Sequence, residues 1–117
     1  MNAIESPATA PALPRFDEID LDAMAGNARN ATDFMKAIAH EGRLMILCRL
    51  SEGECSVAEL EDLLGARQAA VSQQLARLRI EGLVDTRREG KSIYYFIADE
   101  RARTLVATLY GMFCAPR

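Results

Sequence analysis

The stretch SVAELEDLLGARQAAVSQQLARLRIEGLVDTRREGKSIYYF, residues 56–96, contains in a fixed order the signals of two helices and two strands. Its opening run, Ser56-Val57-Ala58-Glu59, has the form of a capping box, in which the serine side chain accepts from the backbone three residues on and the glutamate reaches back. A short helix is therefore predicted to run from there to Leu64. Gly65 ends it, because glycine adopts the left-handed conformation that closes many helices.

A further helix is predicted to begin around Arg67 and to end before Gly82. Its apolar face consists of Val71, Leu75 and Leu78. After Gly82 the hydrophobic period changes, and strand-like residues over 83–98 flank the polar segment Arg88-Glu89-Gly90-Lys91. The glycine of this segment permits a tight reversal, so we predict a β-hairpin.

Two helices are predicted before this stretch. The first begins at Asp20, because Asp20 or Asp22 can cap it, and its apolar residues recur at intervals of three and four: Met24, Ala28, Ala31, Met35 and Ile38. The second stops near Gly53 and is marked by Leu44, Leu47 and Leu50. Residues 1–19 are rich in alanine and proline and then acidic, so we expect a disordered tail. Residues 20–117 are expected to form a single domain.

After the hairpin, a last helix is predicted to begin at Asp99 and to carry two adjacent apolar stripes. One stripe consists of Leu105, Leu109 and Met112, and the other of Val106, Tyr110 and Phe113. Two stripes are wide for a helix that lies on the surface of a domain. We therefore expect one stripe to face the domain core and the other to face a partner subunit.

The order of these elements is typical of a winged helix-turn-helix, in which a tight turn joins the third and fourth helices and a hairpin follows. The predicted fold class is mainly α with a small β-hairpin, in the order α-α-α-α-β-β-α. In that arrangement the fourth helix enters the major groove of double-stranded DNA and the hairpin tip reaches along the phosphates.

The polar residues of those two elements suit DNA binding. Arginine pairs with guanine edges and glutamine with adenine edges, and the candidate base contacts of the helix are Arg67, Gln68, Ser72, Gln73, Gln74 and Arg77. Cations at the hairpin tip neutralise phosphates without reading sequence, and the candidates there are Arg87, Arg88 and Lys91. Any one of these residues is equally well explained as part of a solvated polar face. The set as a whole favours DNA binding, because the order of the elements and the placement of the cations agree.

Charge is segregated along the chain, whose formal net charge is −3 over 117 residues. Residues 67–91 hold six cations and three anions, a net charge of +3, whereas the other residues hold eight cations and fourteen anions. An acidic body thus carries a basic segment, and DNA affinity should fall steeply with salt. No stretch approaches the roughly twenty apolar residues of a membrane span and no secretory signal is visible, so we expect a cytoplasmic protein without a membrane partner.

Several runs of the sequence resemble the ArsR/SmtB family of bacterial repressors, over about residues 21–114. The matching runs are Glu41-Gly42-Arg43-Leu44, Ser56-Val57-Ala58-Glu59-Leu60, Ala70-Val71-Ser72-Gln73-Gln74-Leu75, Leu78-Arg79-Ile80-Glu81-Gly82-Leu83-Val84 and Arg87-Arg88-Glu89-Gly90-Lys91-Ser92-Ile93-Tyr94-Tyr95. The resemblance implies a homodimer, built through the first and last helices, that binds a pseudo-palindromic operator. One departure is Gln74, where many members carry histidine.

Members of this family often bind metals through cysteines of the third helix or through histidine and aspartate of the last. Here Ser56 and Ala58 stand at the two cysteine positions, and the last helix has no histidine. Cys55 lies one residue early, and one thiolate is not a metal site. These departures disfavour metal sensing, and we predict neither a bound metal nor a cofactor. We expect Cys55 to be exposed and dispensable.

Two other thiols remain: Cys48 in the second helix and Cys114 at the end of the last. An odd number of cysteines in a short chain without a signal indicates free thiols in a reducing cytosol. The placement of these two resembles the BigR/SqrR subgroup, dithiol repressors that respond to sulfide through reactive sulfur species. The resemblance implies that Cys48 and Cys114 react with persulfides or polysulfides to form a disulfide or polysulfide bridge, which releases the operator.

Three other interpretations stay open on the sequence alone. A metal or metalloid sensor would use Cys48, Cys55 and Cys114 as a trithiolate site. A thiol enzyme would need Cys48 or Cys114 as nucleophile and His40 as base, but nothing in the sequence places the histidine beside either thiol, so no enzyme and no catalytic residue is predicted. A winged helix that binds only other proteins is the third.

Overall fold

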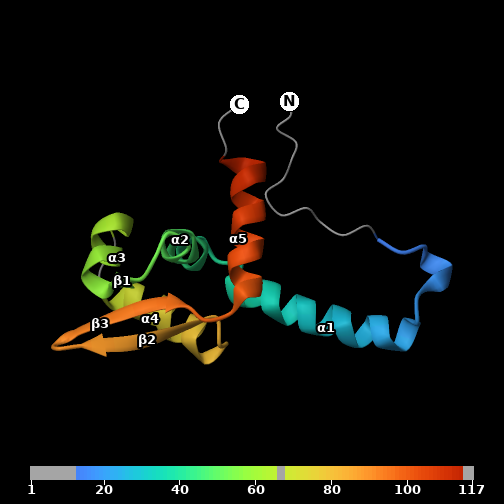
Figure 1. Cartoon of the computed structure of the whole chain (residues 1–117), viewed down its shortest axis with the longest axis horizontal. Coiled ribbons are helices and arrows are strands. Elements are labelled where there is room, and N and C mark those ends of the chain that lie inside the picture. The colour runs from blue at the N-terminus through green and yellow to red at the C-terminus, as the bar shows by residue number, and fades with distance from the viewer. Residues whose placement is uncertain (1–12, 66–67, 115–117) are drawn as a thin grey trace.

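Five α-helices and a small antiparallel sheet make up the part of the chain that a computed structural model describes, residues 13–65 and 68–114 (Figure 1). The helices are α1 (Leu21–Ile38), α2 (Glu41–Leu50), α3 (Val57–Leu64), α4 (Gln68–Ile80) and α5 (Glu100–Phe113). The strands are β1 (Cys55–Ser56), β2 (Val84–Glu89) and β3 (Ser92–Ile97). The predicted order of helices and hairpin is confirmed, and the fold is a winged helix-turn-helix.

The helices begin where the sequence offers an acceptor for their first amides. The Asp20 carboxylate accepts from the backbone N–H groups of Asp22 and Ala23, as predicted for the start of α1. Asp99 caps α5 in the same way, through a bond from the Arg101 amide. The start of α2 uses a less common acceptor, the Nδ1 atom of His40, which takes the Gly42 amide at 3.0 Å.

Helix α3 begins and ends as the local signals predict. Ser56 Oγ accepts from the Glu59 amide, and the Glu59 carboxylate accepts from the Ser56 amide, so both halves of the capping box are present. Gly65 ends α3 with φ at 59°, a left-handed conformation that side chains with a Cβ rarely adopt. The predicted helix from Ser56 to Leu64 is therefore confirmed.

The sheet has one strand more than the sequence predicts. Strands β2 and β3 form the expected hairpin, with Val84 opposite Ile97 and the reversal at Gly90. On its other edge β3 pairs with β1, where Cys55 lies opposite Tyr95. The expectation that Cys55 is exposed is wrong, because its side chain is 0% exposed within the core.

The core lies where α2, α3, α4 and α5 meet the sheet. Its fully buried members include the apolar face predicted for α4 and the last two leucines predicted for α2: Val71, Leu75, Leu78, Leu47 and Leu50. The α5 residues Ala102 and Val106 close the core from the other side. Burial of these faces fixes how α4 is rotated about its own axis, and hence which residues it shows to solvent.

Helix α1 projects from this body, and α5 rises beside its inner end (Figure 1). Only Ala37 and Ile38, in its last turn, are buried, whereas Leu21, Met24 and Met35 are exposed. On α5 the outer residues Tyr110, Met112 and Phe113 are exposed as well. The prediction that one whole stripe of α5 faces the core is wrong, because Val106 is buried whereas Tyr110 and Phe113 of the same stripe are exposed. The outer ends of both stripes lie open in the single chain.

Part of the predicted disordered tail, residues 1–12, lies outside the described residues. Phe16–Glu18, within the rest of it, form a short 3₁₀ helix. Among the helices that the structure describes, none combines the length and the apolar character needed to cross a membrane.

Replacing Ser56 with alanine is expected to lower the free energy of unfolding by about 1 kcal/mol, because the Glu59 amide loses its cap. Urea unfolding followed by circular dichroism measures this. Ser92→Ala is the matched control, since Ser92 is exposed at the start of β3, and it should change stability by no more than about 0.5 kcal/mol. Equal effects of the two substitutions would contradict the capping role.

Candidate functional site

Helix α4 has a buried side and an exposed side, and the exposed side carries most of the candidate base contacts. Successive helical residues are rotated by about 100°, so Gln73 lies opposite the buried residues Val71, Leu75 and Leu78. Ser72, Gln73 and Arg77 are exposed. Gln68 is the first residue of α4, and Arg67 lies outside the described residues.

Gln74 differs from its neighbours because it is half-buried and already hydrogen-bonded. Its Oε1 atom accepts from Nη1 of Arg43 at 2.9 Å. Arg43 belongs to α2, and the same guanidinium donates through Nε to the carbonyl of Ala37 near the end of α1, at 2.7 Å. This candidate base contact is therefore directed toward the body of the protein.

Arg77 forms an ion pair along α4, from its Nε atom to the Glu81 carboxylate at 3.2 Å. Both side chains are exposed, and an exposed pair of this kind contributes little to stability. The guanidinium can therefore exchange the carboxylate for a phosphate or a base edge at small cost.

The hairpin cations fall into two kinds. Arg87 binds the Glu54 carboxylate through Nε and Nη2, also approaches Glu89, and lies with its guanidinium 5.0 Å from the Tyr94 ring centre. These hydrogen bonds raise the pKa of Arg87, and the bond from Arg87 lowers the pKa of Glu54. Glu54 directly precedes β1, so Arg87 anchors the wing to the body.

Arg88 and Lys91 are exposed near the tip of the hairpin. Side chains alternate along a strand, so Arg88 points away from the face on which Arg87 is held. Within residues 13–65 and 68–114, neither Arg88 nor Lys91 has an ion-pair partner. Of the three predicted phosphate contacts, these two have their charges available.

The two candidate sensing thiols belong to helices that pack against each other. Cys48 lies in α2 and is half-buried, whereas Cys114 is exposed at the end of α5. Arg103 of α5 links the two helices, because it donates a hydrogen bond to the carbonyl of Ser51, the residue that follows α2, at 3.1 Å. Burial, and then the negative charge of the Cys114 thiolate, raise the pKa of the Cys48 thiol.

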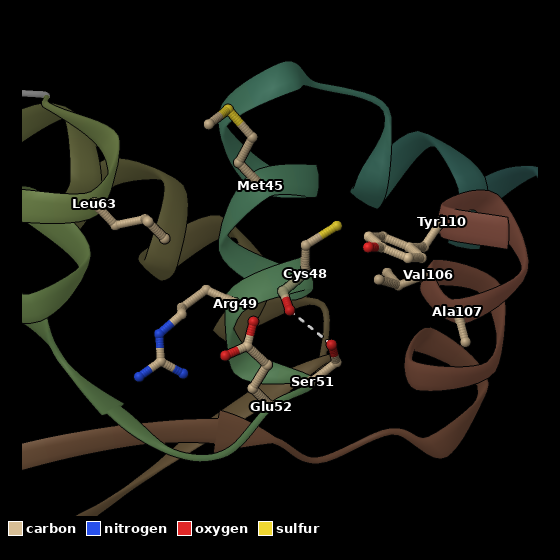
Figure 2. Close-up of a pocket in the computed structure, with 9 residues that line it drawn as sticks. All are labelled: Met45, Cys48, Arg49, Ser51, Glu52, Leu63, Val106, Ala107 and Tyr110. Carbon is tan, nitrogen blue, oxygen red and sulfur yellow. Dashed lines mark hydrogen bonds between the residues drawn. The ribbon is translucent and has the colours of Figure 1, made fainter. Parts of the chain in front are cut away.

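A mostly apolar pocket of about 550 Å³ opens beside Cys48, between α2, α3 and α5 (Figure 2). In the close-up the Cys48 sulfur points toward Tyr110 and Val106, which belong to α5. The pocket gives a small reagent a route to this thiol. It is lined by Met45, Cys48, Arg49, Ser51, Glu52, Leu63, Val106, Ala107 and Tyr110.

The third thiol and the single histidine have structural roles in the fold. Cys55 is packed in the core at β1, and burial raises its pKa. His40 caps α2 through Nδ1. The described residues contain no group of three or more histidine, cysteine, aspartate or glutamate side chains placed to hold a metal ion, so the trithiolate arrangement is not formed there.

Known proteins resemble this chain in sequence and in fold. The model for the arsR family of bacterial regulatory proteins matches residues 40–86. The biofilm growth-associated repressor of Agrobacterium fabrum is 50% identical over 99 residues, which cover 85% of each chain. The chain belongs to the ArsR family. The repressor of the same name from Xylella fastidiosa is 42% identical over 107 residues, which cover 92% of this chain and 89% of that one.

Solved structures of relatives have the same fold. The transcriptional repressor BigR from Xylella fastidiosa matches with a TM-score of 0.76 at 42% identity, over 84% of this chain and all of that one. Reduced HlyU from Vibrio cholerae matches with a TM-score of 0.77 at 39% identity, over 80% and 98% of the two chains. The ArsR-family protein described here is thus a DNA-binding transcriptional regulator and not a thiol enzyme.

The rate at which Cys48 reacts with iodoacetamide should reach half its maximum at a pH above about 8.5, the ordinary pKa of a thiol, because a raised pKa delays formation of the thiolate. Cys114→Ser removes a neighbouring negative charge and should shift this profile to lower pH. Peptide mass spectrometry measures alkylation at Cys48, with buried Cys55 as the unreactive internal reference. Identical profiles with and without Cys114 would show that the two thiols do not interact.

Proposed function

We propose that this ArsR-family repressor is a homodimer that binds operator DNA while Cys48 and Cys114 are reduced, and that reactive sulfur species release it by bridging them. The observation that supports the proposal is the placement of these thiols in α2 and at the end of α5, two helices that pack against each other, with Cys48 open to a pocket. The names of the relatives, biofilm growth-associated repressors, support the repressor role.

DNA binding is assigned to the exposed side of α4 and to the hairpin tip. Ser72, Gln73 and Arg77 offer base and phosphate contacts, while Arg88 and Lys91 offer charge to the backbone. Arg67 and Gln68 keep their predicted role at the start of the helix. Arg87 contributes by holding the hairpin in place, through Glu54.

Dimerisation is assigned to the apolar residues that α1 and α5 leave open. A projecting amphipathic helix gains little stability on its own, because isolated helices are marginal in water. Packing Leu21, Met24 and Met35 of one copy against Tyr110 and Phe113 of another would remove these residues from water. Such a dimer would place two copies of α4 on successive turns of the operator, about 34 Å apart.

The bridging reaction follows from the state of the two thiols. Cys114 is exposed, whereas the raised pKa of Cys48 disfavours its thiolate, so Cys114 attacks first. The Cys114 thiol takes the sulfane sulfur of an organic persulfide, R–S–SH, and releases R–SH, which leaves a Cys114 persulfide. The Cys48 thiol then attacks the Sγ atom of Cys114, the bond from Sγ to the outer sulfur breaks, and that sulfur leaves as hydrogen sulfide while the disulfide forms. If Cys48 also takes a sulfane sulfur from a second organic persulfide, the two cysteine persulfides condense with loss of hydrogen sulfide to a trisulfide bridge, which spans a longer gap than the roughly 7 Å limit of a disulfide.

A bridge between α2 and α5 changes the angle at which the dimer helices meet. Because both copies of α4 must fit the operator at once, a small rotation removes contacts at both half-sites.

A metal- or metalloid-responsive repressor that uses thiolates is the second candidate. It requires Cys55, which is buried in the core, so arsenite or zinc titration of Cys55→Ala separates the two.

The reduced protein is expected to bind its operator about 5- to 150-fold more tightly than protein treated with a polysulfide donor. Cys48→Ser and Cys114→Ser should each abolish the difference. Cys55→Ala is the control, since it removes a thiol outside the pair and should retain the difference. Fluorescence anisotropy measures binding, and mass spectrometry locates added sulfur on Cys48 and Cys114 peptides. Equal affinities before and after treatment with the polysulfide donor would contradict the proposed redox switch.

Arg88→Ala should weaken binding to all duplexes alike, because its guanidinium then no longer neutralises backbone charge. The slope of log affinity against log salt should fall by about 0.9 for each phosphate that the variant leaves without a cation. Arg87→Ala is a matched control, because the same residue type one position earlier is paired with Glu54. Its slope should change little, while the wing becomes less firmly held. Equal changes of slope would mean that Arg87 also meets a phosphate.

A further inference from the structure

Arg43 joins three helices at one point. Its Nε and Nη2 atoms donate to the carbonyls of Ala37 and Lys36, at 2.7 and 3.3 Å, in the last turn of α1. Its Nη1 atom donates to Gln74 Oε1 of α4 at 2.9 Å. Hydrogen bonds from a charged donor are about twice as strong as neutral ones. A half-buried guanidinium thus links the end of α1 and the start of α2 to the middle of α4.

The orientation of the Gln74 amide is set by this contact. With Oε1 toward Arg43, the amide nitrogen faces His40, whose Nε2 atom is 3.5 Å away. His40 already accepts the Gly42 amide on Nδ1, and a neutral imidazole has only one acceptor nitrogen. The Arg43 bond is therefore the one that holds Gln74, and His40 acts as packing.

The Gln74 side chain also lies near the start of α2. A Cβ on Gly42 would come within 3.2 Å of the His40 ring and 3.6 Å of Gln74 Cγ. The start of α2 thus approaches α4 at a glycine. On α4 itself, Gln74 is three residues after Val71 and four before Leu78, so it lies on the flank of the buried stripe.

We propose that Gln74 is a positioning residue, which fixes the orientation of α4 on the corner between α1 and α2 through Arg43 and contacts no base. The proposal rests on the assignment of DNA reading to α4. It separates two adjacent glutamines of one helix. Gln73 faces outward and is available to a base, and Gln74 faces inward and holds α4, whose rotation is set by its buried side, against the corner between α1 and α2.

This arrangement also defines a route between the two ends of the molecule. Arg43 holds backbone carbonyls of α1, the helix assigned to dimerisation, and a side chain of α4, the helix assigned to DNA. A rotation of α1 relative to α2 displaces those carbonyls, and Arg43 transmits the displacement to α4. Regulation at the dimer interface would thus reach the DNA surface without a contact between α5 and α4.

The test compares Gln74→Ala with Gln73→Ala on a duplex that the reduced protein selects from a randomised pool, and on its single-base variants. Gln74→Ala should lower affinity about tenfold, the order of one charged hydrogen bond, on every duplex alike. Gln73→Ala should instead change the base preference at particular positions. A changed base preference in Gln74→Ala, or an unchanged affinity, would overturn the proposal.

A double-substitution cycle tests the link through Arg43. Arg43→Lys keeps the charge but cannot hold three acceptors in a fork, and it should lower affinity as much as Gln74→Ala. The two changes combined should lower it no further, whereas additive losses would mean that Gln74 acts independently of Arg43. Gln74→Glu should restore most of the affinity, because a carboxylate accepts from Arg43, and loss of binding in this variant would also count against the proposal.

The same experiments also check that each variant is folded and that the unmodified protein binds DNA. Thermal unfolding shows whether each variant is folded at the binding temperature, and Gln74→Met preserves the packing if Gln74→Ala does not fold. If the unmodified protein selects no duplex, the assignment of DNA binding fails and the role of Gln74 fails with it. If it selects one and Gln74→Ala behaves as Gln73→Ala does, only the positioning role is wrong.

Discussion

Burial of one side of α4 is the constraint on which the rest of the site depends. Leu75 and Leu78 are fully buried against α2, α3 and the sheet, and they set the rotation of the helix about its axis. That rotation sends Gln73 outward and Gln74 back toward Arg43. A chain of 117 residues builds one core of this kind, so the surface that meets DNA and the stability of the domain have a common origin.

The parts of the fold that the sequence predicts are those with local causes. The capping box at Ser56, the glycine that ends α3 and the reversal at Gly90 involve residues within a few positions of one another. The β1 strand is not predicted, because its partner, β3, lies some forty residues further along the chain. The burial of Cys55 follows from that pairing, so no pattern around Cys55 itself could indicate it.

The candidate site shows the same division between local and distant causes. Residue type and element order identify the DNA-facing elements, including Ser72, Gln73 and Arg88. They do not reveal which cations and amides are already bound within the protein. Gln74 and Arg43 are 31 residues apart, and Arg87 and Glu54 are 33 residues apart. Such contacts need the folded chain, although Arg43 does belong to Glu41-Gly42-Arg43-Leu44, one of the runs on which the resemblance to the ArsR/SmtB family rests.

The separation of an outward and an inward face on α4 has a consequence for how such proteins diversify. Residues at the positions of Ser72, Gln73 and Arg77 are exposed and make few contacts that stabilise the domain, so mutations there are tolerated by the fold. Gene duplication followed by substitution at these positions would yield regulators with new DNA targets. In those copies that keep Gln74 and its bond to Arg43, the inherited response mechanism would then operate on a different set of genes.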